Sequence, residues 1–140
     1  MKKFNIKKVA VLGSGIMGSR IACHFANIGV EVLLLDIAPK ELTEQEQKKG
    51  LSLEHPAVRN RVVNDSFQKA VKAKPAPLYH PDYAQRVKLG NFEDNMKDIA
   101  GYDWIIEVVV EKLEIKKVVF EQVEQYRQPG TLITSNTSGI

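Results

Sequence analysis

The chain has 140 residues, of which 44% are hydrophobic and 26% charged, and its formal net charge at pH 7 is +3. This length suits one domain, and the composition is typical of a globular protein rather than a disordered or membrane-spanning one. The small net charge gives no indication of a nucleic-acid partner. Because the single cysteine, Cys23, has no partner for an internal disulfide, the sequence favours a reducing, cytoplasmic location.

The first 36 residues predict a strand, a turn, a helix and a second strand. The segments Lys7–Leu12 and Glu31–Asp36 are largely apolar, as expected for strands of a parallel sheet that is covered on both faces. Between them, apolar residues recur at helical spacing over a predicted helix, at Ile16, Ile21, Phe25 and Ile28. Cys23 lies within this helix, where a small buried hydrophobic side chain is expected rather than a reactive thiol.

The turn before this helix reads Gly13-Ser14-Gly15-Ile16-Met17-Gly18, which is a G-x-G-x-x-G sequence. In a dinucleotide-binding loop, Gly13 permits the tight turn, Gly15 lets the backbone approach a pyrophosphate, and Gly18 lets the helix pack closely. The N–H groups and the dipole of the following helix then attract the phosphates. Ile16 and Met17 complete this predicted cofactor-binding loop. An ordinary glycine turn is the alternative, since glycine-rich turns are common.

Asp36 ends the second strand, where its carboxylate is placed to accept hydrogen bonds from an adenine ribose. A 2′-phosphate in the same place would be repelled by roughly 4 kcal/mol, for two like charges at ~4 Å and an effective dielectric of ~20. No arginine follows Asp36 immediately, although Lys40 is near. The sequence therefore predicts NAD rather than NADP as the cofactor. The alternative is an aspartate that merely caps the next turn.

The rest of the chain predicts an insertion followed by alternating strands and helices. Between residues 37 and 82 the periodicity is poor, which indicates an insertion with helical pieces such as Phe67–Lys74. The later elements are strands at 87–92, 104–110 and 131–135 and helices at 93–100 and 113–125. The last helix has an apolar stripe formed by Ile115, Val118, Val119, Val123 and Tyr126. This order predicts an α/β fold, a Rossmann-type doubly wound parallel sheet with a helical insertion after the second strand.

Three segments resemble the L-3-hydroxyacyl-CoA dehydrogenase family. They are residues 13–22, residues 103–116 and the Ser-Asn-Thr-Ser sequence at residues 135–138. The likeness extends from about residue 8 to residue 140 and includes the insertion, in which residues 59–92 are similar to the long bacterial members that also carry a hydratase domain. Three ordered motifs at family spacing form a more specific match than the glycine loop alone.

The resemblance implies oxidation of an L-3-hydroxyacyl-CoA to the 3-ketoacyl-CoA by hydride transfer to NAD, in fatty-acid β-oxidation. By motif position, Glu111 and Lys116 should lie beside the bound NAD, near its nicotinamide end. Ser138 should act in catalysis by a hydrogen bond to the 3-oxygen of the substrate. The ordinary alternatives are a first-turn helix charge for Glu111, a solvated charge for Lys116 and a loop serine for Ser138.

The acyl-CoA substrate is the partner that the resemblance implies. Family members contact the CoA arm through a serine and a lysine from the insertion, and the sequence does not show which residues have these roles here. Between residues 40 and 74, eight Lys or Arg stand against five Asp or Glu, so the net charge of +3 lies in this region. Lys69, Lys72 and Lys74 are a candidate surface for the CoA phosphates. A solvated helix face explains the same lysines.

The general base that alcohol oxidation requires is missing from the motifs. In the family a histidine oriented by a glutamate follows the Ser-Asn-Thr-Ser sequence, whereas His24, His55 and His80 all precede it. Residues 1–140 are therefore interpreted as an incomplete NAD-binding domain of a larger enzyme, which alone should bind NAD weakly or moderately and catalyse little. A fifth strand without a covering helix could also let copies associate into a homo-oligomer. The alternatives are a non-catalytic NAD(H)-sensing Rossmann module and a short hydroxy-acid dehydrogenase.

Overall fold

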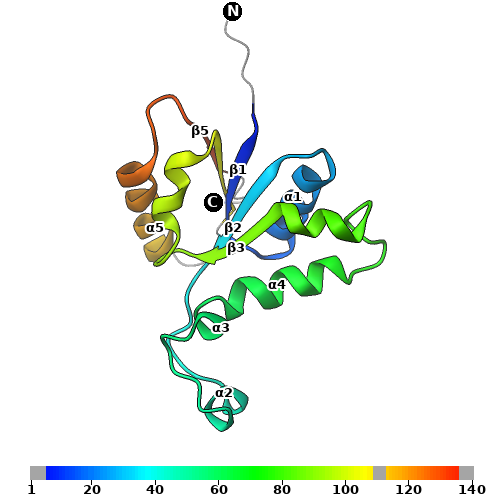
Figure 1. Cartoon of the computed structure of the whole chain (residues 1–140). Helices are drawn as coiled ribbons and strands as arrows, with labels where there is room; N and C mark the ends of the chain where they lie inside the picture. Colours follow the sequence, from blue (N-terminus) through cyan, green and yellow to red (C-terminus); the bar gives the residue numbers. More distant parts are fainter. Residues whose placement is uncertain (1–5, 109–112, 136–140) are drawn as a thin grey trace, which may run out of the picture.

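A five-stranded parallel sheet forms the centre of the computed structural model, which describes residues 6–108 and 113–135 (Figure 1). Its strands are β1 (Lys8–Leu12), β2 (Glu31–Asp36), β3 (Val87–Asn91), β4 (Trp104–Glu107) and β5 (Leu132–Ser135). They lie in the order β3-β2-β1-β4-β5, and every neighbouring pair is parallel. The strands β2 and β3 are added on one side of β1, and β4 and β5 are added on its other side. This change of side at β1 is typical of a doubly wound nucleotide-binding sheet. The predicted Rossmann-type fold is confirmed.

Helices cover both faces of the sheet. On one face lie α1 (Ile16–Asn27) and α4 (Arg61–Val71), and on the other lie the 3-10 helix η2 (Met96–Gly101) and α5 (Leu113–Tyr126) (Figure 1). Successive residues of each strand point to opposite faces of the sheet. In β1, Val9 and Val11 pack on the α1 side, and Ala10 and Leu12 pack on the α5 side. All four are fully buried. This explains why the strands are almost continuously apolar in sequence.

The predicted apolar stripe of α1 is confirmed in part: Ile21 and Phe25 pack partly buried against the core, but the fully buried face of the helix is made of small side chains. Its buried residues are Gly18, Ser19, Ala22, Cys23 and Ala26. Ile16 and Ile28, which share the predicted apolar stripe, are 77% and 61% exposed. The helix begins directly after β1 and lies close against the strands, so there is room only for small residues. Cys23 is buried as expected, and this burial raises the pKa of its thiol.

The apolar stripe of α5 is also narrower than predicted. Val119 and Val123 are buried against the sheet, one helical turn apart, whereas Val118 is 54% exposed. A spacing of four residues keeps two side chains on the same face, and Val118 is rotated away from it. β4 ends at Glu107, before the predicted Val110, which lies outside the described residues.

The insertion after β2 contains more helix than the sequence indicated. It consists of α2 (Glu44–Lys48), α3 (Pro56–Arg59), α4 and the 3-10 helix η1 (Pro81–Arg86). α2 begins with a capping box between Thr43 and Glu46 and buries none of its residues. It projects from the body at the bottom of Figure 1. An ion pair and hydrogen bond between Arg61 and Glu46 tie α2 to the start of α4.

A polar network holds the insertion against the carboxyl end of β3. Asn91 is fully buried, and its Nδ2 donates to Asn60 Oδ1 at 2.8 Å and to Asp94 Oδ2 at 3.0 Å. Its Oδ1 accepts from the backbone N–H groups of Glu93 and Asp94 at 3.0 and 2.8 Å. Arg59 donates to both carboxylate oxygens of Asp94. The network therefore joins α3 and α4 to the loop that follows β3.

Asp94 should make the stability of this junction depend on pH. The pKa of Asp94 is lowered by the hydrogen bond from Arg59 and, next, by that from Asn91. Because the folded state favours the charged carboxylate, Asp94 stabilises the fold above the ordinary aspartate pKa and loses this contribution as the pH falls below it. Asp94→Asn is expected to lower the urea midpoint at pH 7 and to reduce its decrease between about pH 5 and pH 2. Urea unfolding followed by circular dichroism measures both; an equal change in the exposed α5 variant Glu121→Gln would contradict the prediction.

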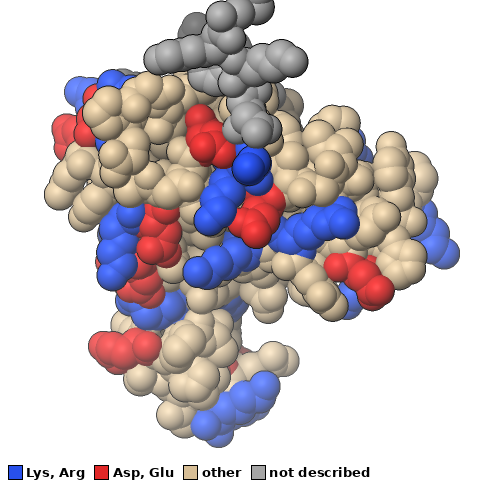
Figure 2. All heavy atoms as spheres, turned by 45° about the horizontal axis from the view of Figure 1, so that its top comes forward, with Lys and Arg blue, Asp and Glu red and all other residues tan. Residues whose placement is uncertain are grey.

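Charges of both signs share the surface. On the face shown in Figure 2, Lys and Arg lie among Asp and Glu. Two arginines of the basic region are paired, Arg59 with Glu93 and Asp94 and Arg61 with Glu46, so the basic excess is less available than the sequence count indicates. Within the described part of the chain, no helix is long and apolar enough to cross a bilayer.

Candidate dinucleotide site and adjoining grooves

The glycine loop between β1 and α1 has the close packing that the motif predicts. Gly13 has a φ of +113°, which favours glycine, and its N–H donates to Leu35 O of β2 at 2.8 Å. A Cβ at Gly18 would lie 1.8 Å from Gly13 O and 3.1 Å from Val108 Cγ2. No side chain other than hydrogen fits at position 18, so the first turn of α1 rests directly on the loop.

The start of α1 is open toward the carboxyl edge of the sheet. A Cβ at Gly15 would meet no atom within 4 Å, and Gly15, the N-cap residue of α1, has no side chain to cap the helix. Ile16 and Met17, the next two residues, are 77% and 49% exposed. An open glycine at a helix N-terminus is the arrangement that accepts a phosphate group. These residues therefore fit the pyrophosphate of a dinucleotide.

Asp36 is buried against the glycine loop, with 8% of its surface exposed. Its Oδ2 accepts from the backbone N–H of Ser14 at 2.8 Å and from the Ser14 hydroxyl. Its Oδ1 accepts from the backbone N–H of Ile37 at 2.7 Å. The carboxylate lies at the predicted place at the end of β2 and is already held by the protein. The bond from Ser14 was not predicted, because the motif does not restrict the residues at its x positions.

The carboxyl ends of β4 and β5 carry a second polar cluster. Glu107 is 1% exposed, and Ser135, which lies opposite it in the sheet, donates from its hydroxyl to Glu107 Oε2 at 2.6 Å. Sequence reasoning did not single out Glu107, although an acidic residue within an apolar strand was the available signal. Of the residues assigned by resemblance to this region, Glu111 and Ser138 lie outside the described part of the chain.

Lys116 lies in the first turn of α5 and is 9% exposed. The alternative of a solvated surface charge is therefore wrong. Both the burial of an ammonium group and its place near the positive end of a helix dipole are unfavourable without a nearby anion or polar acceptor. α5 follows β4, so Lys116 lies toward the same edge of the sheet as Glu107.

A basic groove of about 720 Å³ lies between α1 and the segment formed by α4 and the following loop. Arg20 of α1, Lys69 and Lys74 are its positively charged lining residues, and His24 of α1 lines it as well. Ser14, Gly15 and Ile16 complete the lining where the groove reaches the glycine loop. Lys72, the third lysine of the candidate phosphate surface, is exposed but does not line the groove. The structure thus places two of the three lysines in the groove that the glycine loop also lines.

The outer wall of the basic groove is fixed by Asn27, the last residue of α1. Its Nδ2 donates to Pro77 O, and its Oδ1 accepts from the backbone N–H of Tyr79, both at 2.9 Å. Tyr79 also lines the groove, and it is 81% exposed. Neither Asn27 nor Tyr79 was predicted, because the contact joins residues 50 and 52 positions apart.

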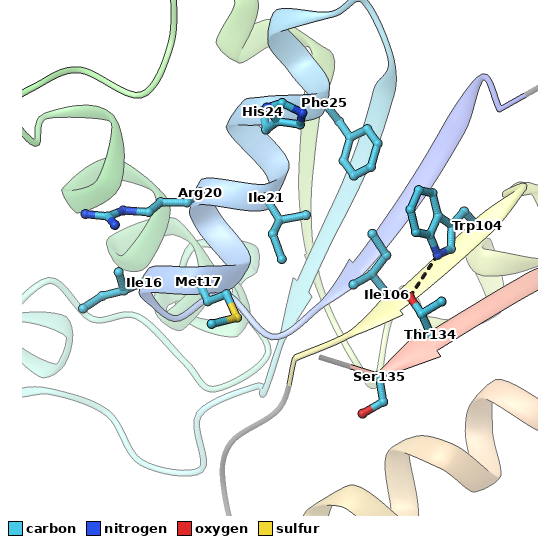
Figure 3. A pocket seen from close by; sticks show the side chains of 10 residues that line it. All are labelled: Ile16, Met17, Arg20, Ile21, His24, Phe25, Trp104, Ile106, Thr134 and Ser135. Atoms are coloured by element: carbon cyan, nitrogen blue, oxygen red, sulfur yellow. Dashed lines mark hydrogen bonds between the residues drawn. The ribbon is translucent and has the colours of Figure 1, made fainter. Parts of the chain in front are cut away.

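A second, apolar groove of about 730 Å³ lies on the other side of α1 (Figure 3). Met17, Ile21 and Phe25 project into it from the helix, and Trp104 and Ile106 line it from β4. The Trp104 ring meets Phe25 edge to face at 5.5 Å, and its Nε1 donates to Thr134 Oγ1 at 3.0 Å. The side chains of Arg20 and His24 line both grooves.

The three histidines have positions away from the ends of β4 and β5. His55 and His80 cap short helices, since their Nδ1 atoms accept from the backbone N–H groups of Ala57 and Asp82, each at 3.1 Å. His24 is exposed on α1 and packs edge to face against Phe25. His24 and Ser135 line the same apolar groove, and they lie at opposite ends of it (Figure 3).

Comparison with known proteins gives a family for this arrangement. Residues 8–140 match the model of the 3-hydroxyacyl-CoA dehydrogenase NAD binding domain. A probable 3-hydroxyacyl-CoA dehydrogenase of Bacillus subtilis is 51% identical over 97% of this chain, and one of Deinococcus radiodurans is 37% identical over 96%. The chain spans 17% and 35% of the lengths of these curated relatives.

Solved structures agree with the sequence relatives. The 3-hydroxybutyryl-CoA dehydrogenase of Escherichia coli K12 is 29% identical with a TM-score of 0.58, covering 97% of this chain and 25% of its own. The (S)-3-hydroxybutyryl-CoA dehydrogenase of Ralstonia eutropha is 26% identical with a TM-score of 0.59, covering 97% and 42%. The predicted cofactor, NAD, is the one named in the family description, and the glycine loop has the geometry to hold it. This chain is thus a member of the 3-hydroxyacyl-CoA dehydrogenase family and corresponds to its NAD-binding domain.

Proposed function

We propose that this chain holds NAD for the oxidation of an L-3-hydroxyacyl-CoA to a 3-ketoacyl-CoA, as part of a longer cytoplasmic enzyme of fatty-acid β-oxidation. In this reaction the hydrogen on C3 leaves as hydride to the nicotinamide ring, and the hydroxyl proton goes to a base. The names and lengths of the relatives support this function. They also favour an enzyme over a non-catalytic NAD(H) sensor or a short hydroxy-acid dehydrogenase.

The cofactor would lie across the carboxyl ends of β1, β2 and β4. Gly13, Gly15, Ile16, Met17 and Gly18 form the loop for the pyrophosphate, as the open N-terminus of α1 supports. Asp36 would then receive the adenine ribose. Glu111 and Lys116 would lie near the nicotinamide, and Ser138 near the 3-oxygen of the substrate. The burial of Lys116 supports a ligand-binding role over a surface charge.

The basic groove is the observation that carries the acyl-CoA part of the proposal. CoA is polyanionic, and an extended anion needs several cations along one channel rather than a single contact. Lys69 and Lys74 line one side of the groove, Arg20 lies on α1, and the inner end reaches Gly15 of the cofactor loop. Ser66 also lines the groove and offers a hydroxyl. Phosphates held there would direct the acyl end of the substrate toward the cofactor.

The base of the reaction would come from a segment other than residues 1–140. His55 and His80 cap short helices, and His24, on α1, lies at the opposite end of the apolar groove from Ser135 (Figure 3). The relatives are several times longer than this chain and have room for further segments. We therefore expect the chain alone to bind its ligands with little or no turnover.

Homo-oligomer formation through β5, an edge strand of the sheet, stays a prediction.

Calorimetric titration of the chain with acetoacetyl-CoA tests the proposal. The double variant Lys69→Ala/Lys74→Ala is expected to weaken this binding about tenfold, equivalent to about 1.4 kcal/mol, because two cations beside the phosphates are lost. The matched control is Lys72→Ala, since Lys72 is exposed next to these residues but does not line the groove. The Kd for NADH should be the same in the unaltered chain, the double variant and Lys72→Ala.

Two results would contradict the proposal. One is a loss of acetoacetyl-CoA binding in Lys72→Ala equal to that in the double variant, which would indicate a diffuse charge effect. The other is rapid oxidation of NADH by acetoacetyl-CoA with the 140 residues alone, followed at 340 nm, which would place the base within this chain.

A further inference from the structure

We propose that the hydroxyl of Ser14 determines cofactor specificity by holding the Asp36 carboxylate in one orientation. In this orientation the glycine loop engages Oδ2, and Oδ1 keeps one acceptor position for a ribose hydroxyl. Ser14 is thus a positioning residue that acts through Asp36. The inference rests on the NAD-binding role of the chain and concerns how NAD is distinguished from NADP.

The geometry shows that Asp36 is fixed from two sides. Ser14 is fully buried and contributes both its backbone N–H and its hydroxyl to Oδ2. The backbone N–H of Ile37 engages Oδ1 at 2.7 Å. The terminal torsion of an aspartate is broad when nothing restrains it, so a carboxylate without these bonds would rotate. Bonds to both oxygens leave it a single orientation.

The number of hydrogen bonds limits what Asp36 offers to a ribose. A carboxylate has about four acceptor positions, two on each oxygen. Ser14 takes both positions on Oδ2, and Ile37 takes one on Oδ1. The remaining position on Oδ1 accepts one ribose hydroxyl. A second hydroxyl would have to displace the hydroxyl of Ser14.

A fixed carboxylate is also a more selective one. A mobile carboxylate turns away from a 2′-phosphate and reduces the repulsion, because like charges repel less as their separation grows. The bonds from Ser14 prevent this rotation, since Oδ2 stays attached to the loop. Loss of the hydroxyl should therefore weaken the binding of NADH and relieve the repulsion of NADPH.

Ser19, in the first turn of α1, provides the matched control. Like Ser14 it is fully buried, but its hydroxyl donates to the backbone oxygen of Ser14 at 2.6 Å. Its removal disturbs the support of the loop, whereas the hydrogen bonds that Asp36 accepts within residues 6–108 and 113–135 come from Ser14 and Ile37. Ser19→Ala should therefore change the binding of NADH and NADPH by the same factor.

The experiment is a fluorescence titration of the chain with NADH and, separately, NADPH. Ser14→Ala is expected to raise the Kd for NADH about tenfold, the effect of one hydrogen bond to a charged group, with the Kd for NADPH unchanged or lower. In Ser14→Ala, the ratio of the Kd for NADPH to the Kd for NADH should therefore fall about tenfold. In Ser19→Ala the same ratio should remain constant. Ser14→Gly also removes the hydroxyl and adds no volume. It should give the same ratio if Ser14→Ala does not fold.

The other outcomes overturn the inference in distinguishable ways. An equal loss for both nucleotides in Ser14→Ala would show that the hydroxyl only supports the loop. Tighter NADH binding would show that the hydroxyl competes with the ribose for Asp36. No NADH binding by the unaltered chain would overturn the NAD-binding role and this inference with it.

Discussion

Gly18→Ala is expected to abolish detectable NADH binding and to lower the free energy of unfolding by about 3 kcal/mol. The added Cβ would stand 1.8 Å from Gly13 O, a contact with backbone that no side-chain rotation relieves. The first turn of α1 would have to move away from the loop. That movement would displace the helix N-terminus that binds the phosphates, so stability and binding would fall together. Urea unfolding followed by circular dichroism and a fluorescence titration with NADH measure the two effects.

Two glycine variants separate this contact from a general effect of alanine. A Cβ at Gly101, at the end of η2, meets no atom within 4 Å, and Gly101→Ala should unfold and bind as the unaltered chain does. Gly15 is open in the same way, but its surroundings are the proposed pyrophosphate site. Gly15→Ala should therefore fold normally and bind NADH weakly. Normal stability of Gly18→Ala would contradict the packing role that the structure gives to this residue.

The sequence predicted the parts of this fold that depend on local patterns. β2 was predicted at Glu31–Asp36 and is found there, because an apolar run between glycine and a charged residue has few other interpretations. The glycine loop was predicted for a similar reason. Its three glycines stand at fixed spacing, and each has its own steric requirement. The requirement at Gly18 comes from Gly13, whose backbone oxygen leaves no room for a Cβ at position 18.

The burial pattern of α1 was harder to predict. Large apolar residues at helical spacing usually mark the buried face, and here Ile16 and Ile28 are exposed. Ala22 and Ala26 face the sheet instead, because the distance between helix and strands is set by the glycine loop. A stripe of small residues has little hydrophobic signal, so only the requirement for close packing at Gly18 could have indicated it.

The candidate site depended on contacts between distant residues, which a single sequence does not reveal. The Ser14 and Asp36 side chains are 22 positions apart, and the two walls of the basic groove are separated by about 50. Of the three lysines proposed for the phosphates, Lys69 and Lys74 line the groove while Lys72 does not. The direction of each lysine depends on where α4 ends, and the sequence placed that end at Lys74 instead of Val71.

Asp36→Asn is expected to reduce the preference of the chain for NADH over NADPH by about a hundredfold. Asparagine has nearly the same shape but no charge, so it removes the repulsion of a 2′-phosphate, roughly 4 kcal/mol for fixed charges before relaxation. The side-chain amide of asparagine is also a donor that must take the place of one carboxylate oxygen. It would then face either the two donors of Ser14 or the backbone N–H of Ile37. An unsatisfied buried polar group should lower the free energy of unfolding by about 1–3 kcal/mol. NADH binding should weaken and NADPH binding should tighten.

Asp103→Asn distinguishes the charge of Asp36 from its support of the backbone. Asp103 also accepts two backbone N–H groups, from Lys7 and Lys8 at 2.9 and 3.0 Å, but it lies at the opposite edge of the sheet, before β4. Both variants should lose stability, because each removes a carboxylate that binds backbone donors. Only Asp36→Asn should change the ratio of the Kd values for NADH and NADPH. An unchanged ratio in Asp36→Asn would mean that discrimination against the 2′-phosphate lies in another residue, since no other carboxylate bonds to the glycine loop among the residues described.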